Sequence, residues 1–478
     1  MIGPRSADTG SVPLMLDAVV VGAGPNGLTA AARLAQAGLS VAVFEAAPTI
    51  GGGARTRPLA DGAVYDVCSA VHPLGAASPA FEALDLGARG LQWLHPPTAA
   101  AHPFDDGDAA VLYRDLDATC AGLGRDGEQW RRAVGGIVAD WAELGEIVFG
   151  PIPQTLARHP LVMARFGIRA GLPASVAARW FRGRDARGLF GGLAAHATSS
   201  LGVPLTTAVA LVLVACAHTA GMPFAAGGSQ SIVDALAGAA TAAGATIECD
   251  RRITSIEQLP TSRAVVLDLT PGQVASLTGR RPPRWRHGEG AWKLDMLLSG
   301  PLPWTAEACR SAGTVHLGGE YAEVAAAERK TARGGLPERP YVLVAQPSVA
   351  DPSRAATGQH VIWAYRHVPG GCTEERATAG IHTQLDRFAP GWRDLVIHSQ
   401  VTTPLMFQAY NECYVGGDIA GGAITPWQLV ARPRLTSDPY RTTTDGVWIC
   451  SQSTPPGPGV HGMCGWQAAA SVLATLAA

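Results

Sequence analysis

Three glycines near the N-terminus have the spacing of a phosphate-binding turn. Gly22, Gly24 and Gly27 follow the short apolar run 18–21 as G-x-G-x-x-G. In a turn from strand to helix, the first glycine permits a tight bend and the second lets the backbone approach a pyrophosphate. The third lets the helix pack closely on the strand, which leaves N–H groups at the helix N-terminus free to hold negative charge. The spacing therefore indicates a dinucleotide site.

A carboxylate follows where the ribose of such a dinucleotide would lie. Glu45 ends a second apolar run, 39–44, and can accept hydrogen bonds from ribose hydroxyls. Between the two runs, residues 28–37 are rich in Ala and Leu and predict a helix that Gly38 terminates. Because strand, helix, second strand and acid occur together, a turn that binds no ligand is the less favoured alternative.

A second glycine-rich loop, 47–57, comes directly after this acid. Its glycines at 51–53 would let the backbone pass close to a ligand. Arg55 and Thr56 could contact phosphate or ribityl oxygens. Because the loop follows the acidic strand end, we expect it to contact the same dinucleotide.

His461 is a candidate acid–base group, since imidazole titrates near neutral pH. It lies in a loop in which Gly457, Gly459 and Gly462 repeat the G-x-G-x-x-G spacing. This loop is not a second fingerprint, because it stands well after its strand and no acidic strand end follows it. A glycine loop that opens a helix can still place N–H groups against a cofactor, with His461 beside it.

Lys293 and His72 are candidate catalytic residues, and each also has a purely structural interpretation. Lys293 and Asp295 share one face of the expected strand 291–300, so an active-site lysine and an ion pair at the sheet surface are both open. His72 precedes Pro73, which favours extended backbone. It is either a hydrogen-bonded structural histidine or a group that faces the bound ligand.

Composition narrows the class of protein. The chain has 478 residues, which is too long for one ordinary core and predicts two domains or an interleaved pair. A net charge of −2 gives no reason to expect a nucleic-acid partner. Nine scattered cysteines without a C-x-x-C pair favour reduced thiols in a cytoplasm over secreted disulfides or a metal site. Residues 1–13 lack an apolar core, so we expect no signal peptide.

The stretch from about 78 to 225 is mostly helical in pattern, with helices expected over 130–148 and 161–190. The second interleaves arginines with apolar residues, which is typical of a solvated helix face or, alternatively, of peripheral contact with an anionic membrane. The apolar run 203–217 is too short to cross a bilayer. We expect it to be a buried helix or the wall of an apolar substrate tunnel.

The fold class predicted is α/β, with a discontinuous Rossmann-like domain and a substrate domain of antiparallel sheet and helices. Residues 227–269 return to alternating strand and helix, which places Ile253 near the adenine side. The second domain takes its strands from 291–300, 341–348 and 360–368. The predicted boundaries are 15–75, 225–285 and 436–478 for the nucleotide domain, and 76–224 and 286–435 for the substrate domain.

Several stretches together resemble the phytoene desaturase-like flavoproteins. They are VVVGAGPNGLTAAARLAQAG, Glu45, GGGARTR and SQSTPPGPGVHGMCGWQAA. QPSVADPSRAATGQHVIWAYRHVPGG and AWKLDMLLSGPLPW look like bacterial relatives of the pyridine nucleotide-disulfide oxidoreductase domain-containing protein 2 type. The resemblance covers nearly the whole chain.

This resemblance implies FAD as the dinucleotide and a fold shared with amine oxidases and Rab GDP-dissociation inhibitors. The residues assigned to FAD are Gly22, Gly24, Pro25, Asn26, Gly27, Glu45, Ala46, Gly52, Gly53, Ala54, Arg55, Thr56, Ile253, Ser451, Gly459, Val460, His461 and Gly462. Two positions depart from the family pattern. Gly53 stands where many members have Arg, and the stretch 450–453 is Cys-Ser-Gln-Ser.

The expected activity is that of an FAD-dependent dehydrogenase or desaturase. It would remove a hydride from a hydrophobic small molecule, isoprenoid or lipid-like, and pass electrons to oxygen or a quinone. His461, Lys293 and His72 are the catalytic candidates. Disulfide reduction by NADPH is disfavoured, because there is one valid fingerprint and no C-x-x-x-x-C pair. The alternatives are an FAD-dependent isomerase or reductase of polyene-like substrates, and a non-catalytic binding protein similar to the GDP-dissociation inhibitors.

Overall fold

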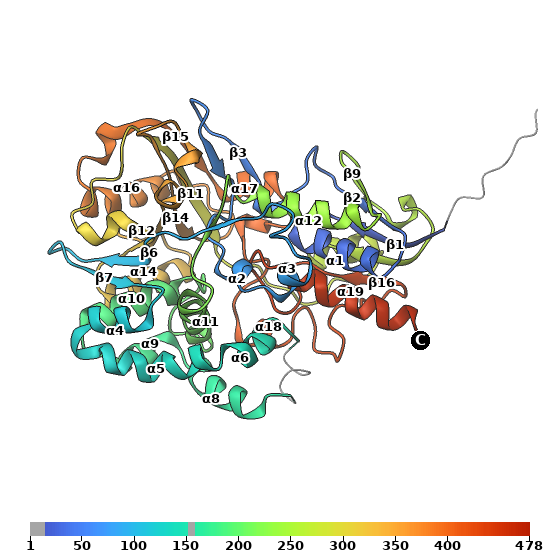
Figure 1. Ribbon diagram of the computed structural model, residues 1–478, viewed down its shortest axis with the longest axis horizontal. Helices are drawn as coiled ribbons and strands as arrows, with labels where there is room; N and C mark the ends of the chain where they lie inside the picture. Colours follow the sequence, from blue (N-terminus) through green and yellow to red (C-terminus); the bar gives the residue numbers. More distant parts are fainter. Residues whose placement is uncertain (1–14, 152–157) are drawn as a thin grey trace, which may run out of the picture.

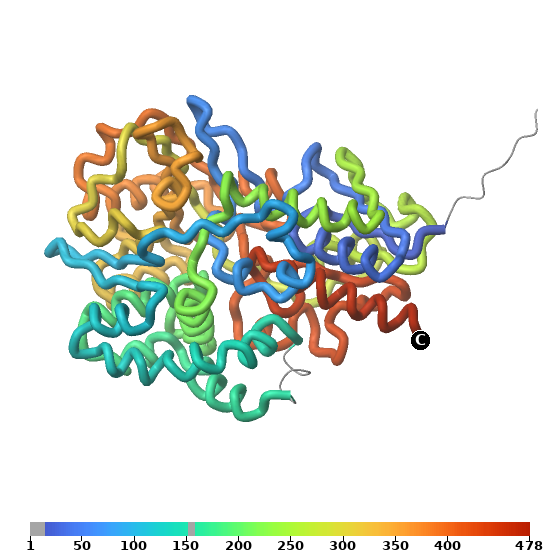
Figure 2. Tube along the Cα trace, viewed as in Figure 1, coloured from blue at the N-terminus to red at the C-terminus, as the bar shows by residue number. Residues whose placement is uncertain are grey.

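The computed structural model describes residues 15–151 and 158–478. A five-stranded parallel sheet forms the half of the molecule that carries the C-terminus (Figure 1). In spatial order its strands are β16 (Val447–Ile449), β10 (Ser262–Leu267), β1 (Leu16–Val21), β2 (Val41–Phe44) and β9 (Thr246–Glu248). Figure 2 shows the blue, yellow-green and red stretches of chain side by side in this half. The predicted discontinuous Rossmann-like arrangement is confirmed.

The N-terminal unit of strand, turn, helix and strand forms as predicted. Helix α1 (Pro25–Gln36) begins before the expected residue 28, because the ring of Pro25 suits the first helical position. Gly38 follows the last turn with a φ of 86°, which favours glycine. Helices α12 (Gln230–Ala242) and α19 (Met463–Leu476) pack against α1. The three helices together bury one face of the parallel sheet.

Helix α19 meets α1 in backbone contact. A Cβ on Gly465 would lie 1.8 Å from the carbonyl oxygen of Asn26, and a Cβ on Gly462 would lie 2.3 Å from Thr29 Oγ1. Only glycine fits at either crossing point. This contact brings the C-terminal loop 459–461 to the edge of the sheet where the N-terminal glycine turn lies.

The second sheet has seven strands in the spatial order β15-β11-β14-β13-β12-β6-β7. Their bounds are β15 (Val396–Thr402), β11 (Gly290–Leu298), β14 (His360–Val368), β13 (Val342–Ala345), β12 (Ala312–Leu317), β6 (Thr98–Pro103) and β7 (Ala109–Leu112). Every neighbouring pair is antiparallel except β12 with β6. The prediction of a largely antiparallel sheet is therefore confirmed.

Helices from the middle of the chain form a layer below this second sheet in Figure 1, and only some of them pack directly on its strands. They are α4 (Leu116–Gly122), α5 (Gly127–Ala139), α6 (Trp141–Val148), α8 (Pro160–Ala170), α9 (Ala174–Ala177), α10 (Arg184–Ala195), α11 (Thr206–His218) and α14 (Tyr321–Ala332). The helix expected over 130–148 breaks at Asp140, and that over 161–190 breaks at 171–173 and 181–183. Strands β6 and β7 were not predicted in this mostly helical segment, because Ala-rich TAAAHP lacks β-branched residues after its first position.

The remaining elements are mostly short connections, except α16, which packs on β11 and β14. They are η1 (Gly52–Ala54), β3 (Thr56–Pro58), β4 (Val64–Asp66), α2 (Pro73–Ala76), α3 (Pro79–Ala83), β5 (Trp93–Leu94), η2 (Gly124–Asp126), η3 (Ala178–Trp180), β8 (Phe224–Ala225), η4 (Ile256–Gln258), α13 (Pro271–Leu277), η5 (Glu307–Ser311), α15 (Pro347–Ala350), η6 (Pro352–Arg354), α16 (Arg376–Phe388), η7 (Trp392–Leu395), α17 (Pro404–Tyr410), η8 (Val415–Gly417) and α18 (Pro426–Val430). The segment 403–437 contains two short helices, α17 and α18, and the 3-10 turn η8.

Across residues 15–151 and 158–478, no single helix has both the length and the apolar character needed to cross a bilayer. The pair α8 and Ala174–Trp180 meets those criteria only when counted together, and it is bent by 84°.

We predict that Gly465→Ala destabilises the fold by several kcal/mol, because the added methyl group would strike the Asn26 carbonyl. Chemical unfolding of the purified variants measures the effect. Gly238→Ala is the matched control, since Gly238 lies inside α12 with nothing near its missing Cβ. The control should gain up to about 1 kcal/mol. Equal stability of the two variants would contradict the crossing described above.

Candidate functional site

A cavity of about 1210 Å³ runs between the two sheets. At one end it is lined by Val21 and Phe44, at the carboxyl ends of β1 and β2, and at the other by Trp363 and Tyr365 of β14. Ordinary ligand pockets enclose roughly 300–1,000 Å³. This cavity therefore has room for an extended ligand and a second molecule beside it.

The glycine turn forms one end of the cavity. Gly22 has a φ of 102°, which the tight bend requires, and it lines the cavity together with Gly24. A Cβ on Gly24 would lie 2.9 Å from Asp268 Oδ2, and one on Gly27 would lie 2.0 Å from the Gly22 carbonyl oxygen. Gly27 therefore serves close packing and lies behind the cavity wall. Gly22 and Gly27 thus have the bend and packing roles that the spacing predicts, and the approach of a pyrophosphate to Gly24 stays a prediction.

Glu45 lines the same end of the cavity, and its carboxylate is held by backbone groups. Oε2 accepts a hydrogen bond from the Ala23 N–H at 2.8 Å, and Oε1 accepts one from the Ala47 N–H at 2.9 Å. Arg55 Nη2 lies 3.6 Å from Oε1. The predicted contact with ribose stays a prediction, but Glu45 already has a second role in bracing the glycine turn.

Arg55 stabilises the second glycine loop from within. Its guanidinium donates to the carbonyl oxygens of Thr49, Ile50 and Gly52 at 2.5–3.3 Å. The side chain lines the cavity but is only 4% exposed. Three of its five N–H groups are thus engaged by the loop, and the expected contact of Arg55 with phosphate or ribityl oxygens stays a prediction.

The side chain of Tyr414 packs so closely on residue 53 that only glycine fits there. A Cβ at this position would lie 1.8 Å from the Tyr414 hydroxyl oxygen, so no side chain fits there. The same segment supplies Tyr410, whose hydroxyl donates to the Gly52 carbonyl at 2.5 Å. The departure from the family pattern at residue 53 is thus explained by the packing of these two tyrosines on the loop.

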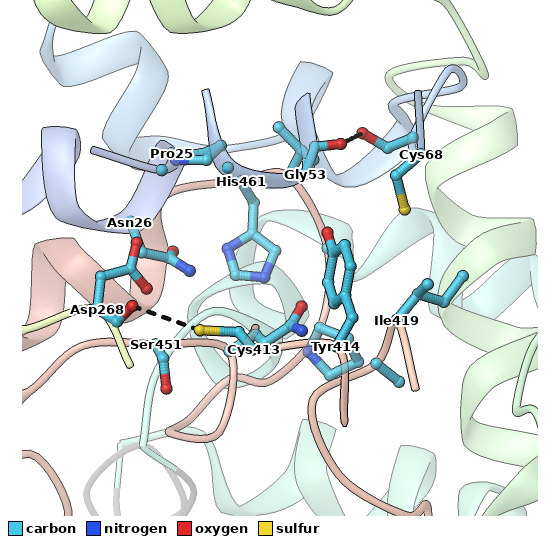
Figure 3. Close-up of a pocket in the computed structure, with 18 of the residues that line it drawn as sticks. Pro25, Asn26, Gly53, Cys68, Asp268, Cys413, Tyr414, Ile419, Ser451 and His461 are labelled. Carbon is cyan, nitrogen blue, oxygen red and sulfur yellow. Dashed lines mark hydrogen bonds between the residues drawn. The ribbon is translucent and has the colours of Figure 1, made fainter. Parts of the chain in front are cut away.

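His461 lies in the cavity wall, in the loop that precedes α19. Figure 3 shows its ring pointing to the middle of the cavity, between Asn26 and Tyr414. Burial lowers the pKa of His461 to about 4, and its Nδ1 accepts the Met463 N–H at 3.0 Å. The expected titration near neutral pH is therefore wrong, because desolvation penalises the imidazolium. A neutral His461 keeps an orienting or hydrogen-bonding role as a prediction.

Lys293 is placed outside the cavity. Its Nζ donates to Asp295 Oδ1 at 2.5 Å and to the carbonyl oxygens of Asp66 and Val67 at 2.7 and 3.2 Å. All three donors are thus engaged, and Lys293 and Asp295 are almost fully buried. The geometry favours the ion-pair alternative over an active-site lysine.

His72 lines the cavity but is held in place by a serine. Its Nε2 lies 2.8 Å from Ser229 Oγ, and Ser229 Oγ donates to the Ser69 carbonyl at 2.6 Å. Burial lowers the pKa of His72 to about 4. This arrangement favours the structural alternative, with a neutral ring at the cavity wall.

Most residues assigned to FAD do line the cavity. Those that do are Gly22, Gly24, Pro25, Asn26, Glu45, Ala46, Gly52, Gly53, Arg55, Ile253, Ser451, Gly459, Val460 and His461. Four assigned residues do not line it: Gly27 and Gly462 serve helix packing, Ala54 is buried in the core, and Thr56 donates to Asp66 Oδ1 at 2.7 Å. The structure gives these four residues supporting roles, and their assigned contacts with the cofactor stay predictions.

Asp268 is a site residue that the motif analysis missed. It follows β10, and its Oδ2 accepts the Gly27 N–H at 3.0 Å beside the cavity. Burial raises its pKa to about 7, and the Glu45 charge adds to this shift. The available signal was an acid at the carboxyl end of an expected parallel strand, where α/β sheets bind ligands.

The far end of the cavity is an apolar chamber. Helix α11 contributes Ala208, Val209, Val212 and Leu213. Further apolar walls come from Met163, Phe166, Met222, Leu343 and Trp363. The run 203–217 forms a largely buried helix, as expected, and one of its faces lines the chamber; its expected role as the wall of a substrate tunnel stays a prediction.

A buried polar chain, also missed from sequence, reaches this chamber. His367 Nδ1 lies 2.7 Å from Glu328 Oε2, and His367 Nε2 lies 3.4 Å from the Tyr365 hydroxyl. Burial opposes protonation of His367, but the charge and hydrogen bond of Glu328 outweigh burial and raise the pKa. Tyr365 lines the chamber, so a protonatable pair stands directly behind a phenol in its wall.

Asp268 predicts a pH dependence of stability. A carboxyl whose pKa rises from 3.8 unfolded to about 7 folded stabilises the fold most below its unfolded pKa, and this contribution falls as pH rises through the folded pKa. Asp268→Asn removes this effect, so its thermal unfolding temperature should fall less than that of the unmodified protein between about pH 5 and about pH 8. Over this pH range the difference corresponds to at most roughly 3 kcal/mol, because about two pH units separate pH 5 from the folded pKa.

Asp234→Asn, at an exposed position on α12, is the control for this experiment. Its stability should follow the same pH profile as the unmodified protein. If Asp268→Asn also follows that profile, the carboxyl is not held in its neutral form.

Comparisons with known proteins agree with this geometry. The family model of the NAD(P)-binding Rossmann-like domain matches residues 20–85. The chain is 26% identical to rat pyridine nucleotide-disulfide oxidoreductase domain-containing protein 2, over 99% of this chain and 96% of that one. It is 34% identical to one of the subunits of limonene dehydrogenase from Castellaniella defragrans, over 24% of this chain and 22% of that one.

A putrescine oxidase variant with redesigned cofactor binding has a TM-score of 0.62 at 18% identity, over 97% of this chain and 99% of that one. The chain therefore has the α/β fold of solved oxidoreductases, with a Rossmann-like domain at its N-terminal end.

Proposed function

We propose that the cavity binds FAD along its length and presents the reactive end to the apolar chamber. The observation that carries this proposal is continuity: a single cavity links the glycine turn, through loops 51–53 and 459–461, to α11. When bound, FAD would supply the capacity to accept two electrons from an organic substrate. A shorter ligand that occupied the glycine turn alone would make no contact with the cavity-lining part of the C-terminal loop, 459–461.

The residues present fit such a cofactor. Gly22 and Gly24 provide a cradle that any Cβ would fill, at the N-terminus of α1. Glu45 and Ile253 would hold the adenosine end, and Gly52, Gly53 and Ser451 the middle. Gly459, Val460 and His461 would meet the ring end.

The substrate we propose is a hydrophobic small molecule. Acidic residues lining the described cavity are Glu45, Asp268 and Glu412, all near the glycine turn or in the loop after α17. The chamber beyond them offers apolar side chains to a guest, and none of the described residues in its wall is an acid that could hold an amine. The partial likeness to a limonene dehydrogenase, named for a terpene hydrocarbon, supports this class.

The chain's own residues would position this substrate and exclude water. Val209, Val212 and Trp363 surround the chamber with hydrocarbon and aromatic surface, which favours an apolar guest over solvent. The Met463 N–H would hold the ring of His461 in its orientation. The ring itself would be neutral, because burial lowers its pKa. Dehydrogenation is the reaction that these features support best.

A second candidate is an FAD-dependent isomerase or reductase of polyene-like substrates. It is favoured by the chain of Tyr365, His367 and Glu328. Protonated His367 could return a proton to the Tyr365 hydroxyl after that hydroxyl had donated to a substrate. Proton delivery of this kind suits isomerisation or reduction better than dehydrogenation.

We predict that the purified protein is yellow and releases FAD on denaturation, at close to one molecule per chain. Gly24→Val should lower the FAD content at least tenfold, because the side chain would enter the cradle and meet Asp268. Mass spectrometry of the released cofactor measures this. Gly238→Ala is the control and should retain FAD. A colourless protein that takes up no added FAD would instead support the non-catalytic binding protein.

We further predict that anaerobic mixing with limonene or squalene bleaches the flavin absorbance persistently, whereas putrescine leaves it unchanged. Val212→Trp should slow bleaching at least tenfold without loss of FAD, because the indole would fill the chamber. Ile397→Trp, at an exposed site on β15, should match the unmodified protein. Conversion of the hydrocarbon without persistent bleaching would favour the isomerase, and bleaching by putrescine alone would overturn the substrate class.

A further inference from the structure

We infer that the rim of the apolar chamber docks on an anionic phospholipid surface. The rim surface consists of Leu161 and Ile168 on α8, and Trp427, Val430 and Leu435 on α18 and the loop after it. Delivery of a substrate from lipid into the chamber rests on the proposed function. Docking itself depends on the surface alone.

These five side chains are unusually exposed for their kind. Leu161 and Ile168 are 75% and 76% exposed, and Trp427 and Leu435 are 65% and 64% exposed. They are half of the large apolar side chains that are exposed in residues 15–151 and 158–478. Single exposed apolar residues need no explanation, but a cluster at the edge of one cavity indicates a binding surface.

The two parts of the rim surface belong to the same opening. Val430 and Leu435 line the cavity and are also exposed, so they stand where the cavity meets solvent. On α8, Met163 and Phe166 line the cavity from the inner side of the helix. Helix α8 is therefore a wall one helix thick between the chamber and the exterior.

The outer side of α8 is mostly apolar and carries one exposed arginine, Arg165. Pro160, Leu161, Ala164 and Ile168 are all exposed, and their spacing of three, four and seven residues puts them on one face. The helix has 11 residues, whereas crossing a bilayer takes about 20. The bent pair of α8 with Ala174–Trp180 has the apolar character of a membrane segment but not its straight length. Such a pair suits a position within the lipid headgroup layer.

The charge around this face complements an anionic surface. From residue 147 to residue 184 the sequence has six arginines and no Asp or Glu. Of these, Arg158, Arg165, Arg179 and Arg182 are exposed. The neighbouring helix α6 contributes opposing charge, since Glu143 and Glu146 flank His159 and Asp140 lies 3.4 Å from Arg165. Arg184 also pairs with Asp106, Asp108 and Asp185. The excess positive charge of this segment therefore rests on Arg158, Arg179 and Arg182, which are exposed.

A second copy of this chain is a less suitable occupant. A two-fold dimer would bring the same surface of each copy together, and with it the same arginines. Like charges facing each other across an interface oppose association. Phosphate headgroups would instead pair with these arginines while the acyl chains receive Leu161, Ile168 and Trp427.

Flotation of the full-length holoprotein with vesicles tests the proposal. Vesicles of phosphatidylcholine containing phosphatidylglycerol should carry the protein, and vesicles of phosphatidylcholine alone should carry at least tenfold less. The double variant Ile168→Ser, Trp427→Ser should bind the anionic vesicles at least tenfold more weakly, because it removes apolar anchors at both parts of the rim. Ile397→Ser, at an exposed apolar residue outside the rim, should bind like the unmodified protein.

Equal binding by the double variant and the unmodified protein would overturn the proposal. So would a dimer, seen by sedimentation equilibrium, that the double variant dissociates. FAD content and flavin bleaching by detergent-dispersed limonene are measured in parallel, so a failure of docking and a failure of the proposed function give different results.

Discussion

Backbone contact at the N-terminal turn is the constraint on which the rest of the structure depends. Gly27 touches the Gly22 carbonyl and donates to Asp268, which ties the start of α1 to β1 and β10 at once. Gly465 then lets α19 rest on the carbonyl of Asn26. Two crossings without side chains thus bring the first and last parts of the chain to one sheet edge. Without them, the two glycine loops that line the cavity would not meet.

The second sheet and its helices give this edge a partner. Strand β14 and helix α11 close an apolar chamber against loops 51–53 and 459–461. Buried charged groups are stabilised by an ion pair in one half and by a backbone hydrogen bond and a raised pKa in the other. Lys293 and Asp295 neutralise each other away from the cavity, whereas Asp268, beside the glycine turn, accepts a backbone N–H and has a raised pKa that favours its protonated form. The acids that line the cavity thus lie away from the chamber, whose wall is largely apolar but includes the Tyr365 hydroxyl.

Local sequence patterns predicted much of this arrangement. Glycine spacing, the Ala-rich helix and Glu45 are short-range signals, and the structure bears out the unit they predict. The ionic state of His461 could not be predicted, because it depends on burial by Phe149 and other residues far away in sequence. Strands β6 and β7 could not be predicted, because their residues form strands only through pairing with distant or neighbouring strands. Strand β6 pairs with β12, and β7 pairs with β6. Asp268 was overlooked since its partner, Gly27, is distant in the chain.

The central claim is that one extended cofactor occupies the cavity from the glycine turn to the C-terminal loop. An experimental structure of the protein with FAD added tests this most directly. The account predicts the pyrophosphate beside Gly24 and the ring system beside Gly459 and His461, with one ring face open to α11. A nicotinamide dinucleotide at the glycine turn, or FAD whose ring points away from the chamber, would contradict it.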